Sequence, residues 1–205
     1  MSEYAFLLPL AAVNLLGAMS PGPSFVIVAK TALGESKEAG LAVALGMGLG
    51  AACFFLLAAF GLYAILETVP MLYMVLKIAG GLYLCYLAVM IFKHAKTPLS
   101  TIKRVKEKHW LGYVGYGLAV QLSNPKTAIV IGSVVVAFLP KEIPPFTPWL
   151  LALMGLVTDV GWYATVVLLF SRPKAQQTYL RLKTSIDRVA GVALGALGIK
   201  VLATP

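Results

Sequence analysis

The chain has 205 residues, of which 60% are hydrophobic and 12% charged, whereas soluble domains are about 45–50% apolar and about 25% charged. This composition excludes an intrinsically disordered chain and predicts a protein that lies in a lipid bilayer. The net charge of +9 comes from Lys and Arg clustered between apolar runs, which is typical of loops beside anionic lipid and argues against nucleic-acid binding.

A helix needs roughly 20 apolar residues to cross about 30 Å of hydrocarbon. Six segments meet this requirement, and in chain order they are 4–29, 39–66, 71–92, 111–139, 148–170 and 186–203. Prolines or basic residues separate them, and the sixth segment is the shortest. We therefore predict an all-α membrane protein, with residues 1–205 forming one transporter domain of six transmembrane helices.

The distribution of Lys and Arg predicts the orientation of these helices, because cytoplasmic loops carry an excess of positive charge. One side of the membrane has few positive charges, with only Lys141 between the fourth and fifth spans and Lys200 near the end of the chain. The first, third and fifth loops carry Lys30, Lys37, Lys93, Lys96, Lys103, Arg104, Lys106, Lys108, Arg172, Lys174, Arg181 and Lys183. We predict that the basic loop 93–110 is cytoplasmic and that both termini face outward.

Two pairs of similar segments indicate an internal repeat. "LKIAGGLYLCYL" (76–87) matches "DRVAGVALGALG" (187–198), and "SPGP" (20–23) corresponds to "LSNP" (122–125). The repeat unit is three helices, over 4–92 and again over 111–203. An odd number of crossings places the second copy upside down, so we predict two inverted three-helix repeats, as in many secondary transporters.

Both repeats have residues unsuited to a helix interior in their first helix. Pro21, Gly22 and Pro23 interrupt the first span, and Asn124-Pro125 interrupts the fourth. Proline lacks an N–H, and backbone groups freed in this way are tolerated in a membrane only inside the protein or beside a wet cavity. Paired breaks at corresponding positions point to a transport site; the alternative is a pair of kinks that only shape the bundle.

Three charged side chains fall within the first five predicted spans. Asp159 and Lys126 lie near mid-depth, whereas Lys77 is shallow enough to reach the interface. Lys126 and Lys77 are the two candidate partners of Asp159, and Lys126 is the better one by depth. An Asp159–Lys126 pair is either purely structural, or Asp159 alternates between its protonated and ionised forms and couples export to proton entry. Neutral polar side chains at comparable depth are Asn14, Ser20, Gln121, Ser123, Asn124 and Thr158.

Glycines at helical spacing predict close helix contacts, mainly within the subunit. They form the run Gly46–Gly50, with Gly at alternate positions, and the pair Gly191 and Gly195. The sequence has no P-loop, HExxH or nucleophile elbow. We therefore expect neither an enzyme nor a cofactor or metal site, and an ion gradient would supply the energy for transport.

"MSPGPSFVIVAKTALGESKEAGLAVALGMGLG", "LKIAGGLYLCYLAVMIFK" and "NPKTAIVIGSVVVAFLP" resemble the LysE/RhtB family of bacterial amino-acid exporters. The likeness covers nearly the whole chain and is strongest over residues 15–140. It implies a protein of the bacterial inner membrane, with both termini on the periplasmic side, that exports a small amino acid in exchange for protons. A homo-oligomer is left open. The positions that match the family's motifs are Pro21, Gly22, Pro23, Lys77, Gly80, Asn124, Pro125 and Lys126; Asp159 is added from its depth alone.

Three other functions remain open. A metal-cation exporter would need several carboxylates, thiols or imidazoles at depth, where Asp159 is the plainest candidate. A thiol-disulfide electron carrier would need cysteines beside the interrupting prolines, but Cys53 and Cys85 lie in the second and third spans. A purely structural membrane subunit is the third alternative.

Overall fold

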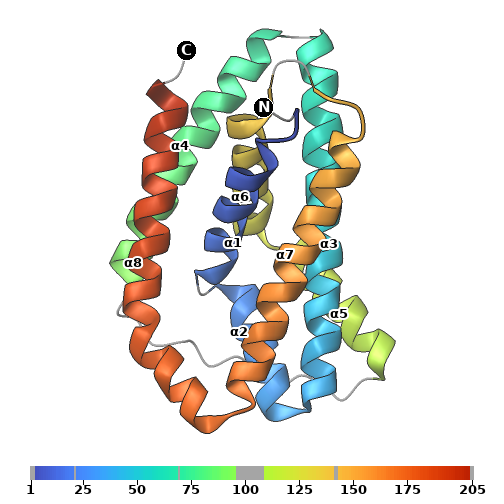
Figure 1. Cartoon of the computed structure of the whole chain (residues 1–205), viewed down its shortest axis with the longest axis vertical. Helices are drawn as coiled ribbons and strands as arrows, with labels where there is room; N and C mark the ends of the chain where they lie inside the picture. Colours follow the sequence, from blue (N-terminus) through green and yellow to red (C-terminus); the bar gives the residue numbers. More distant parts are fainter. Residues whose placement is uncertain (1–2, 21, 69, 96–108, 141–142, 204–205) are drawn as a thin grey trace.

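The structure of the chain is a computed structural model that describes residues 3–20, 22–68, 70–95, 109–140 and 143–203. All regular structure within these residues is α-helical, which confirms the all-α part of the predicted fold class. In chain order the helices are α1 (Leu7–Met19), α2 (Pro23–Gly34), α3 (Lys37–Thr68), α4 (Pro70–His94), α5 (Trp110–Leu122), α6 (Pro125–Phe138), α7 (Thr147–Phe170) and α8 (Pro173–Ala203). Most of them run along the long axis of the molecule (Figure 1).

Three described helices are long and apolar enough to cross a membrane. They are the segments Lys37–Leu62, Met74–His94 and Thr147–Phe170, and the number of candidate spans rises to five when each of two bent helix pairs counts as one. The predicted sixth span, 186–203, is not among them, since it carries Asp187, Arg188 and Lys200 within 18 residues. Six crossings therefore stay a prediction.

At two basic segments the helix boundaries differ from the predicted ones. Helix α2 continues to Gly34 and so includes Lys30, and α8 begins at Pro173 and so includes Lys174. Proline is well suited to the first turn of a helix, because the missing N–H would have no intrahelical partner there. The predicted fifth loop is thus mostly helical. Pro21, Lys141 and most of the basic loop, 96–108, lie outside the described residues.

The predicted interruptions of the first and fourth spans are confirmed. Helices α1 and α2 meet at 62° and helices α5 and α6 at 64°, and both breaks lie near the middle of the long axis (Figure 1). Helix α1 begins and α8 ends at the same end of the molecule, while α3 and α5 begin at the opposite end.

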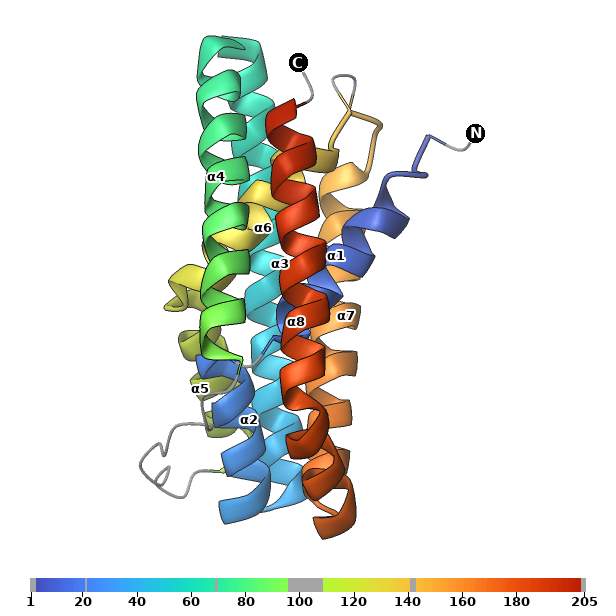
Figure 2. The same cartoon turned by 90° about the vertical axis from the view of Figure 1, so that its left-hand side faces the viewer.

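Several helices approach each other closely at glycines, where no side chain separates their backbones, as the glycine spacing predicts. A methyl group added at Gly46 on α3 would overlap the carbonyl of Val114 on α5, and one added at Gly117 on α5 would overlap a backbone carbonyl of α3. Helices α4 and α8 lie side by side in both views (Figures 1 and 2). A Cβ on Gly198 would lie 2.8 Å from the carbonyl oxygen of Gly81.

The buried apolar residues form two clusters. The first includes Phe55 and Leu151 and is built mainly from α3, α4, α6 and α8. The second includes Phe25 and Tyr163 and is built mainly from α2, α3 and α7. Helix α7 contributes to both clusters, and its buried polar residue Asp159 falls between the two contributions. The apolar core is therefore divided at the level of this carboxyl group.

Candidate functional site

The centre of the candidate site is the side chain of Asp159 on α7, which is 3% exposed. Its Oδ1 accepts a hydrogen bond of 3.0 Å from Nδ2 of Asn14 on α1, and its Oδ2 accepts one of 2.9 Å from Nε2 of Gln121 on α5. The Asn14 amide also donates to the hydroxyl of Thr158 at 2.9 Å. Two neutral amides from two different helices thus satisfy both oxygens of a buried carboxyl group.

A chain of hydrogen bonds connects this carboxyl group to both helix breaks. Oε1 of Gln121 accepts a bond of 2.7 Å from the hydroxyl of Ser24, and that hydroxyl accepts one of 2.9 Å from Nδ2 of Asn124. Ser24 follows Pro23 in the first turn of α2. Asn124 is the N-cap of α6, and its side chain accepts from the backbone N–H of Lys126 at 3.1 Å, a standard way to satisfy an unpaired N–H at a helix start.

Lys126 reaches from α6 to the end of α1. Its Nζ donates to the backbone carbonyl of Ser20 at 3.0 Å and to that of Gly17 at 3.4 Å. The helical partner of the Gly17 carbonyl would be the N–H of residue 21, and proline has none. The lysine ammonium therefore replaces a hydrogen bond that the sequence removes.

The predicted ion pair between Asp159 and Lys126 is not formed in the described part of the chain. The carboxyl oxygens accept from Asn14 and Gln121, and the ammonium donates to the two carbonyls of the first break. Depth along two helices placed these side chains at one level, but their directions around the helix axes bring them to different partners. Lys77, the other candidate partner, lies on α4 and is not part of this network; it is buried and has an interaction of its own.

Helix ends of both signs meet at this level. The N-termini of α2 and α6 carry partial positive charge, and the C-termini of α1 and α5 carry partial negative charge. Lys126 adds a full positive charge beside the N-terminus of α6. Asp159 provides a carboxyl group that is hydrogen-bonded to the amides of Asn14 and Gln121. This arrangement offers separate places for an anionic and a cationic group, which is the charge pattern of a zwitterion.

A cavity of about 30 Å³ lies at this junction. Such a volume holds a water molecule, whereas sites for small molecules measure about 300–1,000 Å³. In this conformation the site is closed around its own polar groups, and a larger ligand requires the broken helices to separate. The polar or small residues that line the cavity are Asn14, Gly17, Ala18, Ser20, Gly22, Ser24, Gln121, Asn124, Lys126, Thr127, Asp159 and Tyr163.

The structure brings together most of the residues that the sequence pointed to. Six of them, Asn14, Gly22, Gln121, Asn124, Lys126 and Asp159, line the cavity. Pro23 and Pro125 occupy the first positions of α2 and α6 and do not line it. Pro21 lies outside the described residues, and Lys77 lies elsewhere on α4.

Sequence reasoning missed three polar lining residues, Ser24, Thr127 and Tyr163, of which Thr127 directly follows the predicted Lys126. Ser24 was hidden as a small residue in an apolar run, although its place directly after the interrupting Pro23 was a usable signal. Tyr163 is four residues after Asp159 and so shares its helix face. Within the described residues no group of three or more His, Cys, Asp or Glu could hold a metal ion, and Cys53 and Cys85 are free thiols away from the breaks.

Comparison with known proteins adds a family and relatives of similar length. The profile of the family described as LysE type translocator matches residues 15–204. The chain is 29% identical to the threonine efflux protein of Escherichia coli (strain K12), over 95% of this chain and 96% of the relative. It is 31% identical to the threonine efflux protein of Salmonella typhi (94% and 95%) and 26% identical to the leucine efflux protein of Enterobacter sp. (strain 638) (86% and 83%). No solved structure matches the chain significantly.

Proposed function

The chain belongs to the family of LysE type translocators, and from that premise we propose that it exports a small neutral amino acid, threonine being the first candidate. The observation that carries the proposal is the continuous chain of hydrogen bonds from both helix breaks to the buried carboxyl group of Asp159. Relatives named for threonine efflux, which match over 94–95% of this chain, support the choice of cargo.

The polar groups at the junction suit the two charges of an amino acid. Its carboxylate would be attracted to the N-termini of α2 and α6 and to the Lys126 ammonium, since helix N-termini favour anions. Its ammonium would be attracted to Asp159 and to the carbonyls of Gly17 and Ser20. Those carbonyls now accept from Lys126, so binding of the substrate carboxylate to Lys126 would free them for the substrate ammonium.

A side-chain hydroxyl on the substrate would also find partners at this site. The Ser24 hydroxyl and the amides of Asn14, Gln121 and Asn124 supply donors and acceptors in a buried setting. A site built to hydrogen-bond a hydroxyl discriminates against analogues that lack it. The geometry therefore favours threonine over leucine, the cargo in the name of a more distant relative.

Transport requires movement at the breaks, because the cavity of about 30 Å³ is too small for any amino acid. We propose that the chain crosses the membrane six times as two inverted three-helix repeats, and that α8 is the sixth crossing. The similar bends of 62° and 64° in the two repeat-related helix pairs support this arrangement. Rocking of one repeat against the other would then open the site alternately to each side.

Protons are the proposed coupling ion. Asp159 is a buried carboxyl group held by neutral amides, so no fixed cation in its hydrogen-bond shell locks it in the ionised form. An intramembrane ionisable residue of this kind is typical of a proton relay. Proton entry would neutralise Asp159 and release the substrate ammonium outward. Both termini would face the periplasm, as the loop charges predict.

Analysis of culture medium tests the cargo directly. Bacterial cells that overproduce the protein should accumulate threonine outside, faster than cells that produce the Asp159→Asn variant at the same membrane level. The matched control is Thr165→Val, which changes an exposed side chain on the same helix. Equal external levels of all amino acids with and without the protein would contradict the proposed function.

A further inference from the structure

A second and larger cavity adjoins the closed site. Its volume is about 260 Å³, near the lower end of the range of about 300–1,000 Å³ for small-molecule sites. It lies between α4, α8 and the first helix break, with an apolar wall that includes Leu87 and Met90. Ser20, Gly22 and Lys126 line both cavities, so the two meet at the lysine.

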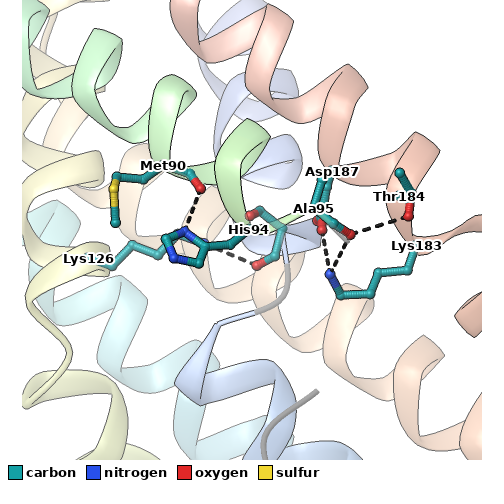
Figure 3. A network of polar contacts seen from close by, with 8 residues as sticks. Met90, His94, Ala95, Lys126, Lys183, Thr184 and Asp187 are labelled. Atoms are coloured by element: carbon teal, nitrogen blue, oxygen red, sulfur yellow. Dashed lines mark hydrogen bonds and ion pairs between the residues drawn. The ribbon is translucent and has the colours of Figure 1, made fainter. Parts of the chain in front are cut away.

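The polar wall of this second cavity comes mainly from α8 and the end of α4. Lys183 and Asp187 form an ion pair of 2.7 Å, and the Lys183 ammonium also donates to the Ala95 carbonyl at 3.1 Å. Nδ1 of His94 donates to the backbone carbonyl of Met90, one turn earlier on α4, at 2.9 Å. Figure 3 shows Lys126 on one side of this region and the Lys183–Asp187 pair on the other.

Asp187 has an unused acceptor. The residue is 4% exposed, its Oδ2 is the atom paired with Lys183, and its Oδ1 is buried with no hydrogen-bond partner among the described residues. Nearly all buried polar atoms in folded proteins have a partner, and a buried carboxylate oxygen without one is costly. This atom therefore points to a donor that the described part of the chain does not supply.

We propose that this second cavity is a waiting site for the zwitterionic head of the amino acid before it reaches Asp159; the inference rests on the proposed export function. The ammonium of the substrate donates to Oδ1 of Asp187, and its carboxylate is attracted to Lys126. Lys126 then belongs to both sites. When its ammonium moves away from the Gly17 and Ser20 carbonyls, the substrate can move from the second cavity toward Asp159. His94 lines this cavity and its side chain is exposed. It belongs to the segment 93–110 that is predicted to be cytoplasmic, so the cavity would open toward the cytoplasm there.

Initial rates in inside-out membrane vesicles test this site, since they present the cytoplasmic face to the medium. The Asp187→Asn variant should raise the KM for threonine by about tenfold or more, the loss expected for one charge-assisted hydrogen bond, with kcat within about twofold of wild type. Asp187→Glu should restore most of the affinity. The matched control is Arg188→Gln, an exposed charge on the next residue of α8, which should leave both constants unchanged.

The outcomes separate the two proposals. An unchanged KM in a well-inserted Asp187→Asn variant overturns the waiting site, while wild-type uptake of threonine keeps the export function. Absence of amino-acid uptake by the wild-type protein overturns the export function itself.

A second measurement leaves Asp187 intact, in case its substitution disturbs folding. Met90→Cys, in a background with Cys53→Ala and Cys85→Ala, places a thiol on the cavity wall. Threonine should slow its modification by N-ethylmaleimide several-fold, even when Asp159→Asn disables the central site. Threonine should not slow modification of the control Val89→Cys, whose side chain is exposed outside the cavity. Equal rates with and without threonine at Met90→Cys overturn the waiting site.

Discussion

The ammonium of Lys126 on α6 donates to the backbone carbonyl of Ser20 at the end of α1, over 3.0 Å. The second broken helix thus stabilises the first at the point where proline removes a backbone donor. Asn124 and Ser24 form a second connection between the same two breaks, at 2.9 Å. Because the two interruptions hold each other closed, any movement that opens one also strains the other, which is a physical basis for coupled gating.

Asp159→Asn should abolish proton-driven export while leaving the protein in the membrane. Asparagine has nearly the same volume but cannot gain or lose a proton, and it offers one acceptor where the carboxylate offers two to Asn14 and Gln121. The measurement is threonine movement driven by a pH gradient in proteoliposomes. Wild-type rates for this variant would remove Asp159 from the coupling mechanism, and Thr165→Val serves as the control.

Lys126→Ala should impair both stability and export. It leaves the carbonyls of Gly17 and Ser20 without their ammonium donor, and an unsatisfied buried polar group costs about 1–3 kcal/mol. Thermal unfolding of the detergent-purified protein measures the first effect and vesicle transport the second. Arg188→Gln removes a positive charge from an exposed position on α8 and should change neither. A Lys126→Ala protein as stable and as active as wild type would show that the lysine bridge is dispensable.

The bond between Ser24 and Asn124 should appear as a coupling energy. Each single change to Ala weakens the protein, because Ser24→Ala frees the Asn124 amide and also the Gln121 oxygen. The double variant should cost less than the sum of the two single variants by about 0.5–3 kcal/mol. Unfolding free energies of the four proteins give this value, and strict additivity would mean that the bond contributes nothing.

Gly117→Ala should destabilise the packing of α5 on α3, whereas Gly115→Ala should not. A Cβ at Gly117 would overlap the Val43 carbonyl, but one at Gly115 meets nothing within 4 Å. Overpacking typically costs about 1–3 kcal/mol, and alanine in place of glycine at an open helix position gains up to about 1 kcal/mol. The two melting temperatures should therefore move in opposite directions, and a shift of the same sign and size in both would contradict the close helix contact.

Some features of this protein could be predicted from local sequence because their causes are local. A long apolar run has to satisfy its backbone within itself in lipid, so helices follow from composition. Proline removes a donor wherever it stands, so the breaks before Pro23 and Pro125 follow from the residue type. Depth along a helix is a count of residues, and the two side chains predicted at one depth, Asp159 and Lys126, do line one cavity at the breaks.

Which groups pair with one another was decided only by the tertiary structure. Residue counting gives height along a helix but not the direction of a side chain relative to helices that are distant in sequence. Packing of α7 against α1 turns Asp159 toward Asn14, Gln121 reaches the same carboxyl group from α5, and the bend of the first break presents the Ser20 carbonyl to Lys126. Asp187 is a mixed case: its ion pair with Lys183 joins residues four apart on α8, whereas the cavity wall around its unused oxygen forms only when α8 packs beside α4.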